Sequence, residues 1–230
     1  MQVDFKAREL TIKLVYYGPA LSGKTTNLQS LHRLVAQDQR TRLMTLETRD
    51  DRTLFFDLLP MVFKSADLSL RLKVFTVPGQ VIHNATRRLV LQGADGIVFI
   101  ADSQIAETRA NAESFINLKQ NLRDLGIDVK QMPLVIQFNK RDLPDVRSDD
   151  DLAVLAAKGR EPVFKAVAVR DQGVAETFVG LLSMVLHRLD VQADLSRKFN
   201  VDPQKLLQDV CDRLHLAGTE PNHARLGGAT

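Results

Sequence analysis

Residues 18–25 read Gly-Pro-Ala-Leu-Ser-Gly-Lys-Thr and fit the pattern G-x-x-x-x-G-K-[ST]. The segment before this stretch, residues 10–17, is rich in β-formers and ends at the Gly-Pro pair. After it, residues 24–36 carry leucine and valine on one helical face. A strand, a glycine-containing loop and a helix in this order are typical of a loop whose backbone N–H groups bind phosphate at the positive end of the helix.

The residue types in this loop suit a nucleoside triphosphate bound with Mg²⁺. The two glycines allow the backbone to approach a phosphate closely, because they have no Cβ. Lys24 supplies a mobile positive charge for the β- and γ-phosphate oxygens, and the Thr25 hydroxyl can bind Mg²⁺. We therefore expect the loop and the start of the helix to bind the nucleotide through Gly18, Ala20, Leu21, Ser22, Gly23, Lys24, Thr25 and Thr26.

Apolar segments with strand or helix spacing alternate along the rest of the chain. Further strands are predicted at residues 43–46, 68–74, 96–101, 134–138 and 163–169. Further helices are predicted at residues 110–122, 149–157 and 174–189. This alternation implies βαβ crossovers, so we predict a three-layer α/β domain over residues 1–189, with a mostly parallel six-stranded sheet and helices on both faces. Residues 190–230 are predicted to form a C-terminal helical extension, with one helix at about residues 203–216 and a flexible end.

Composition narrows the class of protein. The 230 residues are 44% hydrophobic and 26% charged, which is ordinary for a globular chain, and the net charge of +3 comes without a dense basic stripe that would indicate nucleic-acid binding. The single cysteine, Cys211, excludes a disulfide framework and a four-cysteine zinc site. No apolar stretch approaches the ~20 residues of a membrane span, and the ends carry no signal core or lipidation motif. We expect a cytoplasmic protein, monomeric by itself, without a lipid anchor or transmembrane segment.

The segment Asn139-Lys140-Arg141-Asp142 directly follows the predicted strand 134–138 and suggests which base is bound. The carboxylate of Asp142 can accept both N1–H and the N2 amino group of guanine, whereas adenine offers no such donor pair. Asn139 can bridge this loop to the phosphate loop, and the Lys140 stem can lie along the purine plane. The segment favours GTP over ATP. It therefore argues against a P-loop kinase or ATPase, which would prefer ATP.

A second polar segment, residues 76–80, reads Thr-Val-Pro-Gly-Gln and follows the predicted strand 68–74. The Gly79 N–H can contact a γ-phosphate, and the adjacent Gln80 can orient the attacking water. Taken alone, this segment would be an ordinary polar turn.

A third polar segment, residues 50–53, lies between the second and third predicted strands, where a loop could cover the nucleotide. Thr53 could complete Mg²⁺ coordination beside Thr25, and Arg52 could neutralise charge in the transition state. The apolar residues that follow, within 54–59, fit equally well an exposed partner-docking patch and simple core packing.

The order of these motifs resembles the Ras-like small GTPases, and the motifs are most similar to the bacterial MglA-like branch, which acts in gliding motility and cell polarity. The matching stretches are residues 15–19, 23–28, 51–57, 76–80, 101–104 and 139–144, and the resemblance covers about residues 8–190. The resemblance implies a P-loop G domain and a GTP/GDP switch with Mg²⁺ as cofactor. It also implies that the Ala168 N–H meets the base oxygen.

The resemblance further implies how the switch is regulated. Arg52, Lys24 and Gln80 are the expected catalytic residues, with the arginine supplied by the GTPase itself and repositioned by a Roadblock-type, MglB-like partner. We expect slow, partner-stimulated hydrolysis of GTP to GDP that controls polarity or surface motility. Polarity or motility effectors and recruitment to a cell pole in the GTP-bound form complete this expectation.

Two positions depart from the Ras-like pattern. Thr76 stands where most Ras-like proteins have an Asp that holds Mg²⁺ through water, a threonine that MglA-like sequences share, so that contact can pass to Asp57 or to water. Ala20 stands where Ras and MglA proteins have Gly, and its methyl can crowd the transition-state arrangement of Gln80 while sparing ground-state binding. This predicts slow intrinsic hydrolysis. The alternative function is a GTP-binding scaffold that hydrolyses negligibly and acts only by recruiting partners.

Overall fold

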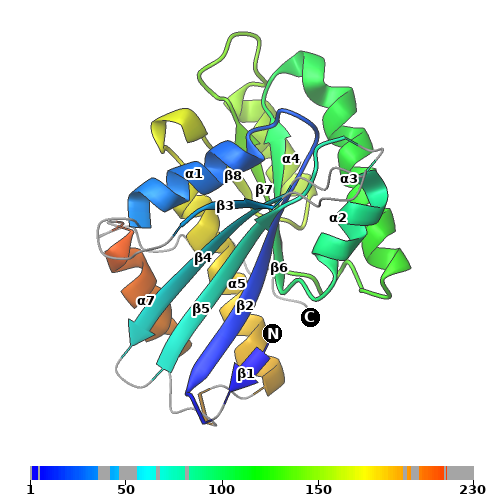
Figure 1. Ribbon diagram of the computed structural model, residues 1–230. Coiled ribbons are helices and arrows are strands. Elements are labelled where there is room, and N and C mark those ends of the chain that lie inside the picture. Colours follow the sequence, from blue (N-terminus) through cyan, green and yellow to red (C-terminus); the bar gives the residue numbers. More distant parts are fainter. Residues whose placement is uncertain are drawn as a thin grey trace.

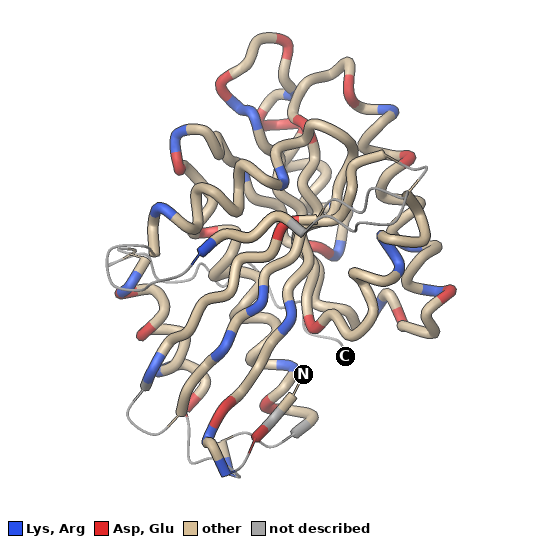
Figure 2. The backbone as a smooth tube through the Cα atoms, viewed as in Figure 1, with Lys and Arg blue, Asp and Glu red and all other residues tan. Residues whose placement is uncertain are grey.

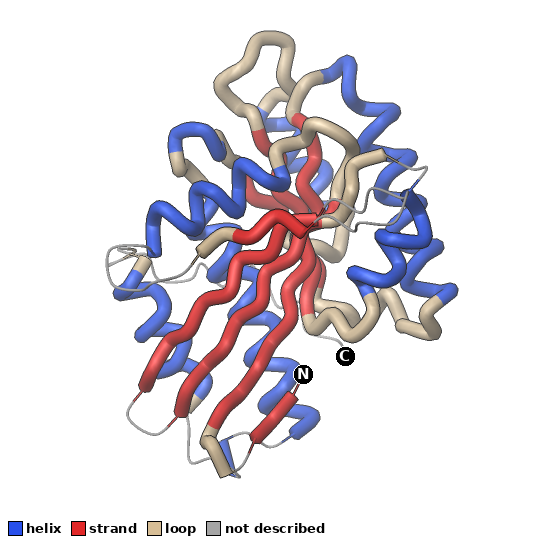
Figure 3. The backbone as a smooth tube through the Cα atoms, viewed as in Figure 1, coloured by secondary structure: helices blue, strands red, loops and turns tan. Residues whose placement is uncertain are grey.

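The computed structural model describes residues 2–4, 6–35, 42–46, 56–65, 68–80, 83–193, 196–197, 202–214 and 216. In this part of the chain, eight strands form one sheet that carries helices on both faces (Figures 1 and 3). The strands are β1 (Gln2–Asp4), β2 (Glu9–Tyr17), β3 (Met44–Leu46), β4 (Phe56–Ser65), β5 (Leu68–Thr76), β6 (Gly96–Asp102), β7 (Leu134–Asn139) and β8 (Val163–Lys165). The α-helices are α1 (Lys24–Val35), α2 (Asn84–Leu91), α3 (Thr108–Asp124), α4 (Asp149–Lys158), α5 (Val174–Ala193) and α7 (Pro203–Arg213), and two 3₁₀ helices are η2 (Ile105–Glu107) and η3 (Ala168–Arg170).

The strand order is β3-β4-β5-β2-β6-β7-β8, with β1 paired to β2 outside this path. Strands β5, β2, β6, β7 and β8 run parallel, whereas β1, β3 and β4 each join by an antiparallel pairing. The carboxyl ends of the parallel strands therefore meet at one edge of the sheet, where ligands bind in open α/β sheets. Because β4 is antiparallel to β5, its first residues arrive at that same edge, with Leu58 opposite Phe75.

The sheet separates two apolar cores. Alternate residues of β2 from Leu10 to Tyr16 pack with α1, α5 and α7 on one face, and Val15 and Tyr17 pack with α2 and α3 on the other. Figure 2 shows both signs of charge distributed over the outer helices and loops. By contrast, β7 carries no charged residue and β6 carries only Asp102 at its end. Such sequences are typical of strands covered on both faces.

Helix α7 packs on the same face as α1 and α5, against β4 and α5 (Figure 1). Asp202 caps the helix by accepting a hydrogen bond from the Gln204 N–H at 2.8 Å, and Pro203 occupies the first helical turn, where its missing N–H costs nothing. At the other end, the Arg213 guanidinium donates to the Lys64 carbonyl of β4 at 3.2 Å. The apolar side of the helix is buried through Leu206, Leu207, Val210, Cys211 and Leu214. Residues 217–230, expected to be flexible, lie outside the described residues.

The fold class is the one predicted, but the sheet has two strands more than the six expected. Strands β1 and β4 were not predicted. In β4, residues 57, 59, 61 and 63 are buried in alternation, but a charged Asp57 and a proline, Pro60, interrupt the apolar pattern. The pairing with β3 ends at Leu58, so Pro60 lies on an edge of β4 where its missing N–H is tolerated. Leu59 is fully buried, which supports core packing at this position, whereas residues 54 and 55 lie outside the described residues.

Two further elements differ from the sequence expectation. Strand β8 ends at Lys165 rather than at residue 169, because the chain turns there into η3. The turn is closed by left-handed conformations at Asp171 and Gly173. Helix α2 was not predicted, and it begins four residues after the polar segment 76–80. Of the helices in the described residues, none is both long enough and apolar enough to cross a membrane.

Candidate nucleotide and magnesium site

The loop between β2 and α1 has glycines where other backbones or side chains approach it. A Cβ at Gly18 would lie 2.2 Å from the Ile100 carbonyl oxygen of β6. A Cβ at Gly23 would lie 2.2 Å from the Asn139 amide nitrogen, and the φ of Gly23 is +96°. Both positions therefore exclude larger residues. Between them, Leu21 also adopts a left-handed φ of 59° and leaves its side chain exposed.

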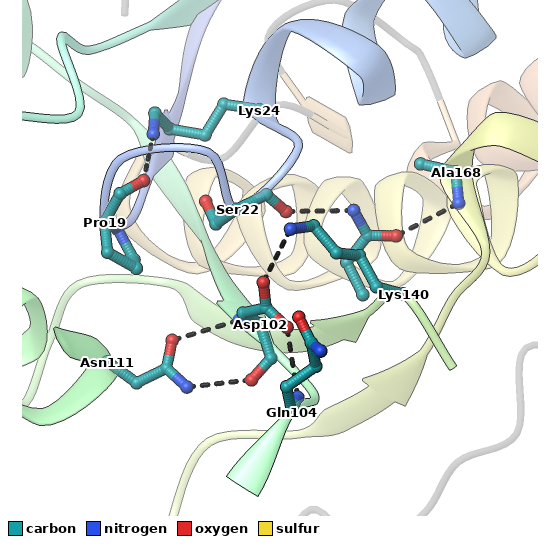
Figure 4. Close-up of polar contacts among 9 residues, drawn as sticks. Pro19, Ser22, Lys24, Asp102, Gln104, Asn111, Lys140 and Ala168 are labelled. Atoms are coloured by element: carbon teal, nitrogen blue, oxygen red, sulfur yellow. Dashed lines mark hydrogen bonds and ion pairs between the residues drawn. The ribbon is translucent and has the colours of Figure 1, made fainter. Parts of the chain in front are cut away.

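Lys24, the first residue of α1, is buried with its ammonium group turned back over this loop. Its Nζ donates hydrogen bonds to the carbonyls of Pro19 at 2.5 Å and Gly18 at 3.2 Å (Figure 4). Burial is the main cause that lowers the pKa of Lys24 to about 7; the nearby Arg87 acts in the same direction and Asp57 opposes both. The loop thus holds a poorly solvated cation whose charged form an anion would stabilise strongly.

Asp57 of β4 is the hydrogen-bond acceptor for three threonine hydroxyls that lie on three different segments. Its carboxylate accepts hydrogen bonds from the hydroxyls of Thr25 at 2.7 Å, Thr76 at 3.1 Å and Thr45 at 3.0 Å. The Asp57 N–H donates to the Thr76 hydroxyl at 2.8 Å, which fixes the strand beside the phosphate loop. The structure therefore joins α1, β3, β4 and β5 at a single carboxylate.

The donor set around Asp57 fits Mg²⁺. The residue is 7% exposed, and no Lys, Arg or His in the described part of the chain forms an ion pair with it. A buried carboxylate that forms no ion pair is costly, so a bound cation would stabilise it. Carboxylate and hydroxyl oxygens are hard ligands of the kind that Mg²⁺ accepts alongside phosphate oxygens and water. Asp57 thus lies beside Thr25, one of the two predicted metal ligands.

Asn139, at the end of β7, ties the phosphate loop to the segment after β8. Its amide nitrogen donates to the Ser22 carbonyl at 2.9 Å, and its amide oxygen accepts from the Ala168 N–H at 3.0 Å (Figure 4). The first of these contacts is the bridge expected between this loop and the phosphate loop. The Ala168 N–H, which the family resemblance assigns to a base oxygen, would have to be shared between Asn139 and that oxygen.

The next residue, Lys140, has a left-handed φ of 65° and reaches back to the end of β6. Its ammonium pairs with Asp102 at 2.6 Å, where the aspartate is buried. The Asp102 carboxylate also accepts from the Gln104 N–H, and the Asn111 side chain bonds both backbone groups of Asp102 (Figure 4). The Lys140 stem is therefore held between two fixed ends, as a surface for a flat ring requires.

Asp142, the proposed guanine-reading residue, lies in the turn after β7 next to η3. Its carboxylate is 3.7 Å from the guanidinium of Arg170, which is 64% exposed at the side chain. An ion pair at this distance with an exposed partner is weak, so the carboxylate keeps its capacity to accept hydrogen bonds from a ligand. Asn139, Lys140 and Asp142 thus lie on one loop beside the phosphate loop.

The Thr76–Gln80 segment touches the phosphate loop at Ala20. A Cβ on Gly79 would lie 2.4 Å from the Ala20 Cα and 3.1 Å from its Cβ, so only glycine fits there. The following residue, Gln80, is exposed, and its carbonyl accepts from the His83 N–H at 3.2 Å. The structure thus places Ala20 directly against the glycine that precedes Gln80.

The structure brings most of the predicted site residues together and leaves two unplaced. Thr26 lies in the first turn of α1, beside the loop. Arg52 and Thr53 lie outside the described residues. Sequence analysis assigned no role to Asp102 or to Arg87. Asp102 has a recognisable signal, an acidic residue that ends a buried strand, whereas Arg87 adjoins a second arginine and has none.

Comparison with known proteins agrees with this geometry. No family model matches the chain. The Mutual gliding-motility protein MglA of Myxococcus xanthus (strain DK1622) is 43% identical over 188 residues, which cover 81% of this chain and 96% of that protein. Identity at this level over nearly the whole relative, with the phosphate loop and the Asn139–Asp142 segment in place, shows the family. The chain belongs to the MglA-like family of small GTPases of the Ras superfamily.

Proposed function

We propose that this small GTPase is a molecular switch that hydrolyses GTP to GDP slowly, responds to a partner, and controls cell polarity or surface motility. The observation that carries the proposal is the Asn139 bridge. Its two hydrogen bonds, to Ser22 and Ala168, couple the phosphate loop to the segment that would read the base. The similarity to a protein named for gliding motility supports the biological part of the proposal.

Binding of the phosphates rests on Lys24, on the N–H groups of the loop and on the cluster around Asp57. Lys24 binds the β- and γ-phosphates as a point charge. Asp57 takes over the role of the aspartate that most Ras-like proteins carry at the position of Thr76, and Thr25 and Thr53 complete the protein ligands. When bound, Mg²⁺ would offset the negative charge of the phosphates. The hydrogen bonds from Thr25 and Thr76 to Asp57 support this assignment.

Recognition of guanine rests on the loop after β7. Asp142 accepts the N1–H and N2 amino hydrogens, the Lys140 stem covers one face of the ring, and the Ala168 N–H meets the base oxygen. The weak ion pair of Asp142 and the fixed position of the Lys140 ammonium support these roles. Adenine would leave the Asp142 carboxylate without donors, so ATP should bind far more weakly.

Hydrolysis requires a water molecule oriented toward the γ-phosphate and a positive charge that neutralises the negative charge of the transition state. Gln80 orients the water, the Gly79 N–H contacts the γ-phosphate, and Arg52 neutralises charge in the transition state. A Roadblock-type, MglB-like partner brings Arg52 into place, which makes hydrolysis partner-dependent. In the GTP-bound form the protein is recruited to a cell pole, where it binds polarity or motility effectors.

Chain organisation follows from the same resemblance. Residues 1–189 are the G domain and residues 190–230 are a C-terminal helical extension. Two observations support this division: the curated relative covers 81% of the chain, and α7 adds its apolar side to a core that β2, β4, α1 and α5 already share.

The scaffold alternative has one observation in its favour, which is the contact between Ala20 and Gly79. The methyl of Ala20 occupies space next to Gly79. Because Gln80 follows Gly79 directly, we expect this methyl to restrict the way Gln80 orients water. A scaffold would bind GTP with full affinity and release no phosphate under any condition.

Phosphate release measured in single turnover separates the switch from the scaffold. The switch predicts slow release by the chain alone and at least roughly tenfold faster release with the partner, in line with the large effects of arginine fingers. Gln80→Leu should abolish release while GTP binding persists, and Arg52→Ala should abolish only the stimulation. Absence of release with the partner present, while GTP is bound, would establish the scaffold instead.

A further inference from the structure

Arg87 of α2 is a fully buried arginine whose hydrogen bonds go to uncharged oxygens. It is 0% exposed, and no carboxylate in the part of the chain that the structure describes lies within ion-pair distance of its guanidinium. Burial of an unpaired charge is expensive. A buried arginine of this kind therefore indicates a role other than stabilising the fold.

Two of the groups that Arg87 contacts are the carbonyls of the segment before Gln80. Its Nε donates to the Pro78 carbonyl at 2.9 Å and its Nη2 donates to the Gly79 carbonyl. A planar guanidinium binds two acceptors in a fixed relative orientation. A flexible ammonium group in the same place would not impose this orientation on both carbonyls.

Fixing these carbonyls also fixes two N–H groups. The Pro78 carbonyl and the Gly79 N–H belong to one planar trans peptide, and the Gly79 carbonyl and the Gln80 N–H belong to the next. In a trans peptide the N–H points away from the C=O. The Gly79 N–H is therefore directed away from Arg87, and Gly79 lies against Ala20 of the phosphate loop.

The other side of the guanidinium is anchored in a polar network between β2, α2 and α3. Its Nη1 donates to the Asn117 amide oxygen at 2.7 Å and approaches the Tyr17 hydroxyl at 3.4 Å, and the guanidinium lies over the Tyr17 ring at 5.2 Å. Asn84 and Asn121 complete the network by bonding one another, Asn117 and Tyr17. Each of these five side chains bonds at least two of the others, so the network restricts where the guanidinium can lie. Tyr17 also directly precedes the phosphate loop, so the network joins the two phosphate-contacting segments.

We propose that Arg87 is a positioning residue, which aims the Gly79 N–H and the backbone of Gln80 at the γ-phosphate by holding the carbonyls of Pro78 and Gly79. This role rests on the proposed function and adds a residue to it. Because GDP has no γ-phosphate, Arg87 should distinguish GTP from GDP. Its positive charge also reaches the site, since it contributes to the lowered pKa of Lys24.

The test compares Arg87→Lys with the parent chain in three measurements: affinity for GDP, affinity for a non-hydrolysable GTP analogue, and the single-turnover rate of hydrolysis. The lysine keeps the charge and loses the two-pronged geometry. We expect GDP affinity to stay within about threefold, while analogue affinity and hydrolysis each fall by roughly tenfold or more, the usual range for a residue that orients a contacting group. A purely structural role would lower both affinities in proportion and leave their ratio unchanged.

Two further variants make the result decisive. Arg88→Lys is the matched control, because Arg88 is exposed on the same helix and pairs with Asp124 at 3.6 Å, and it should change none of the three values. Asn117→Ala releases the guanidinium from its other side without touching Arg87, and it should shift the GTP-to-GDP ratio in the same direction. This variant decides the question if Arg87→Lys does not fold.

Different outcomes overturn different statements. An unchanged ratio and an unchanged rate in Arg87→Lys or, if it does not fold, in Asn117→Ala, with GDP bound normally, would refute the role of Arg87 alone. A parent chain that binds no GDP would refute the proposed function, and the role of Arg87 with it.

Discussion

Three charged side chains define the site at the scale of single residues. Lys24, Asp57 and Arg87 are each at least nine-tenths buried, and each comes from a different element. Burial makes their charges strong because little water screens them. The predictions at this scale therefore concern charge, protonation and the space around them.

Replacing Asp57 with Asn tests its assignment to Mg²⁺. Asn keeps the size of the side chain and removes the charge, so GDP affinity measured with Mg²⁺ should fall by about 10- to 100-fold. Affinity measured in EDTA should stay close to that of the parent. The control is Asp150→Asn, an exposed carboxylate on α4, which should alter neither value. If Mg²⁺ strengthens GDP binding equally in Asp57→Asn and the parent, the metal is held elsewhere.

Protonation of Lys24 should make nucleotide binding pH-dependent. The pKa of this lysine is lowered to about 7 by burial, whereas contact with phosphates favours its charged form, so binding takes up a proton above that pH. Affinity for GDP should consequently fall by up to about tenfold per pH unit between pH 7.5 and 8.5. Calorimetry in buffers of different ionisation enthalpy measures the proton uptake directly.

The control for this prediction is Lys24→Arg, whose guanidinium stays charged throughout the range. Its affinity should be lower than that of the parent and nearly independent of pH. A flat pH profile in the parent, without proton uptake, would show that Lys24 is charged before binding.

Replacing Ala20 with Gly tests whether its methyl slows hydrolysis. The methyl lies against Gly79, so its removal should free Gln80 and raise the rate by roughly tenfold, which corresponds to about 1.4 kcal/mol of barrier. GTP affinity should hardly change, because the effect belongs to the transition state. An exposed alanine, Ala106→Gly in η2, serves as the control. A rate equal to that of the parent, with and without partner, would remove Ala20 from the explanation.

At the scale of secondary-structure elements, α7 should contribute to the stability of the whole domain. Leu206 of α7 is buried in the core shared with β2, β4 and α5. Leu206→Ala should therefore lower the free energy of unfolding by about 2–5 kcal/mol. If the substitution detaches α7 from the domain, the decrease cannot exceed the stability that α7 contributes. Chemical denaturation measures this change, and the exposed Lys205→Ala should shift it by less than about 0.5 kcal/mol. Equal stabilities of Leu206→Ala and the parent would mean that α7 is not held in the core.

The elements that could be predicted from sequence are those with an uninterrupted pattern. Strands β2, β6 and β7 are largely apolar runs that end at glycine or polar residues. Helix α4 begins at residue 149 as predicted, and Ser148 and Asp151 form a reciprocal pair of hydrogen bonds at its start. Strand β4 was missed because Asp57 and Pro60 break its alternation. The carboxylate of Asp57 accepts hydrogen bonds from three threonine hydroxyls, a set of contacts that the strand pattern does not indicate.

At the scale of the whole molecule, the position of the site follows from the parallel strands, and this much could be inferred from sequence. Motifs that follow β2, β5 and β7 meet at one edge because the strands run in the same direction. The contacts of Asp57 with Thr45 and of Arg87 with Pro78 and Tyr17 could not be inferred. They depend on how separate elements pack, which periodicity does not encode.

The central claim is that the chain recognises guanine and binds GTP as a molecular switch. Competition between nucleotides tests this claim most directly. The measurement is displacement of a fluorescent GDP by GTP or ATP with Mg²⁺, in the parent and in Asp142→Ala. The parent should prefer GTP by roughly 10⁴-fold, because a site built to bond a donor pair rejects a base that lacks it, and Asp142→Ala should lose most of that preference. Equal displacement by ATP and GTP in the parent would contradict the account.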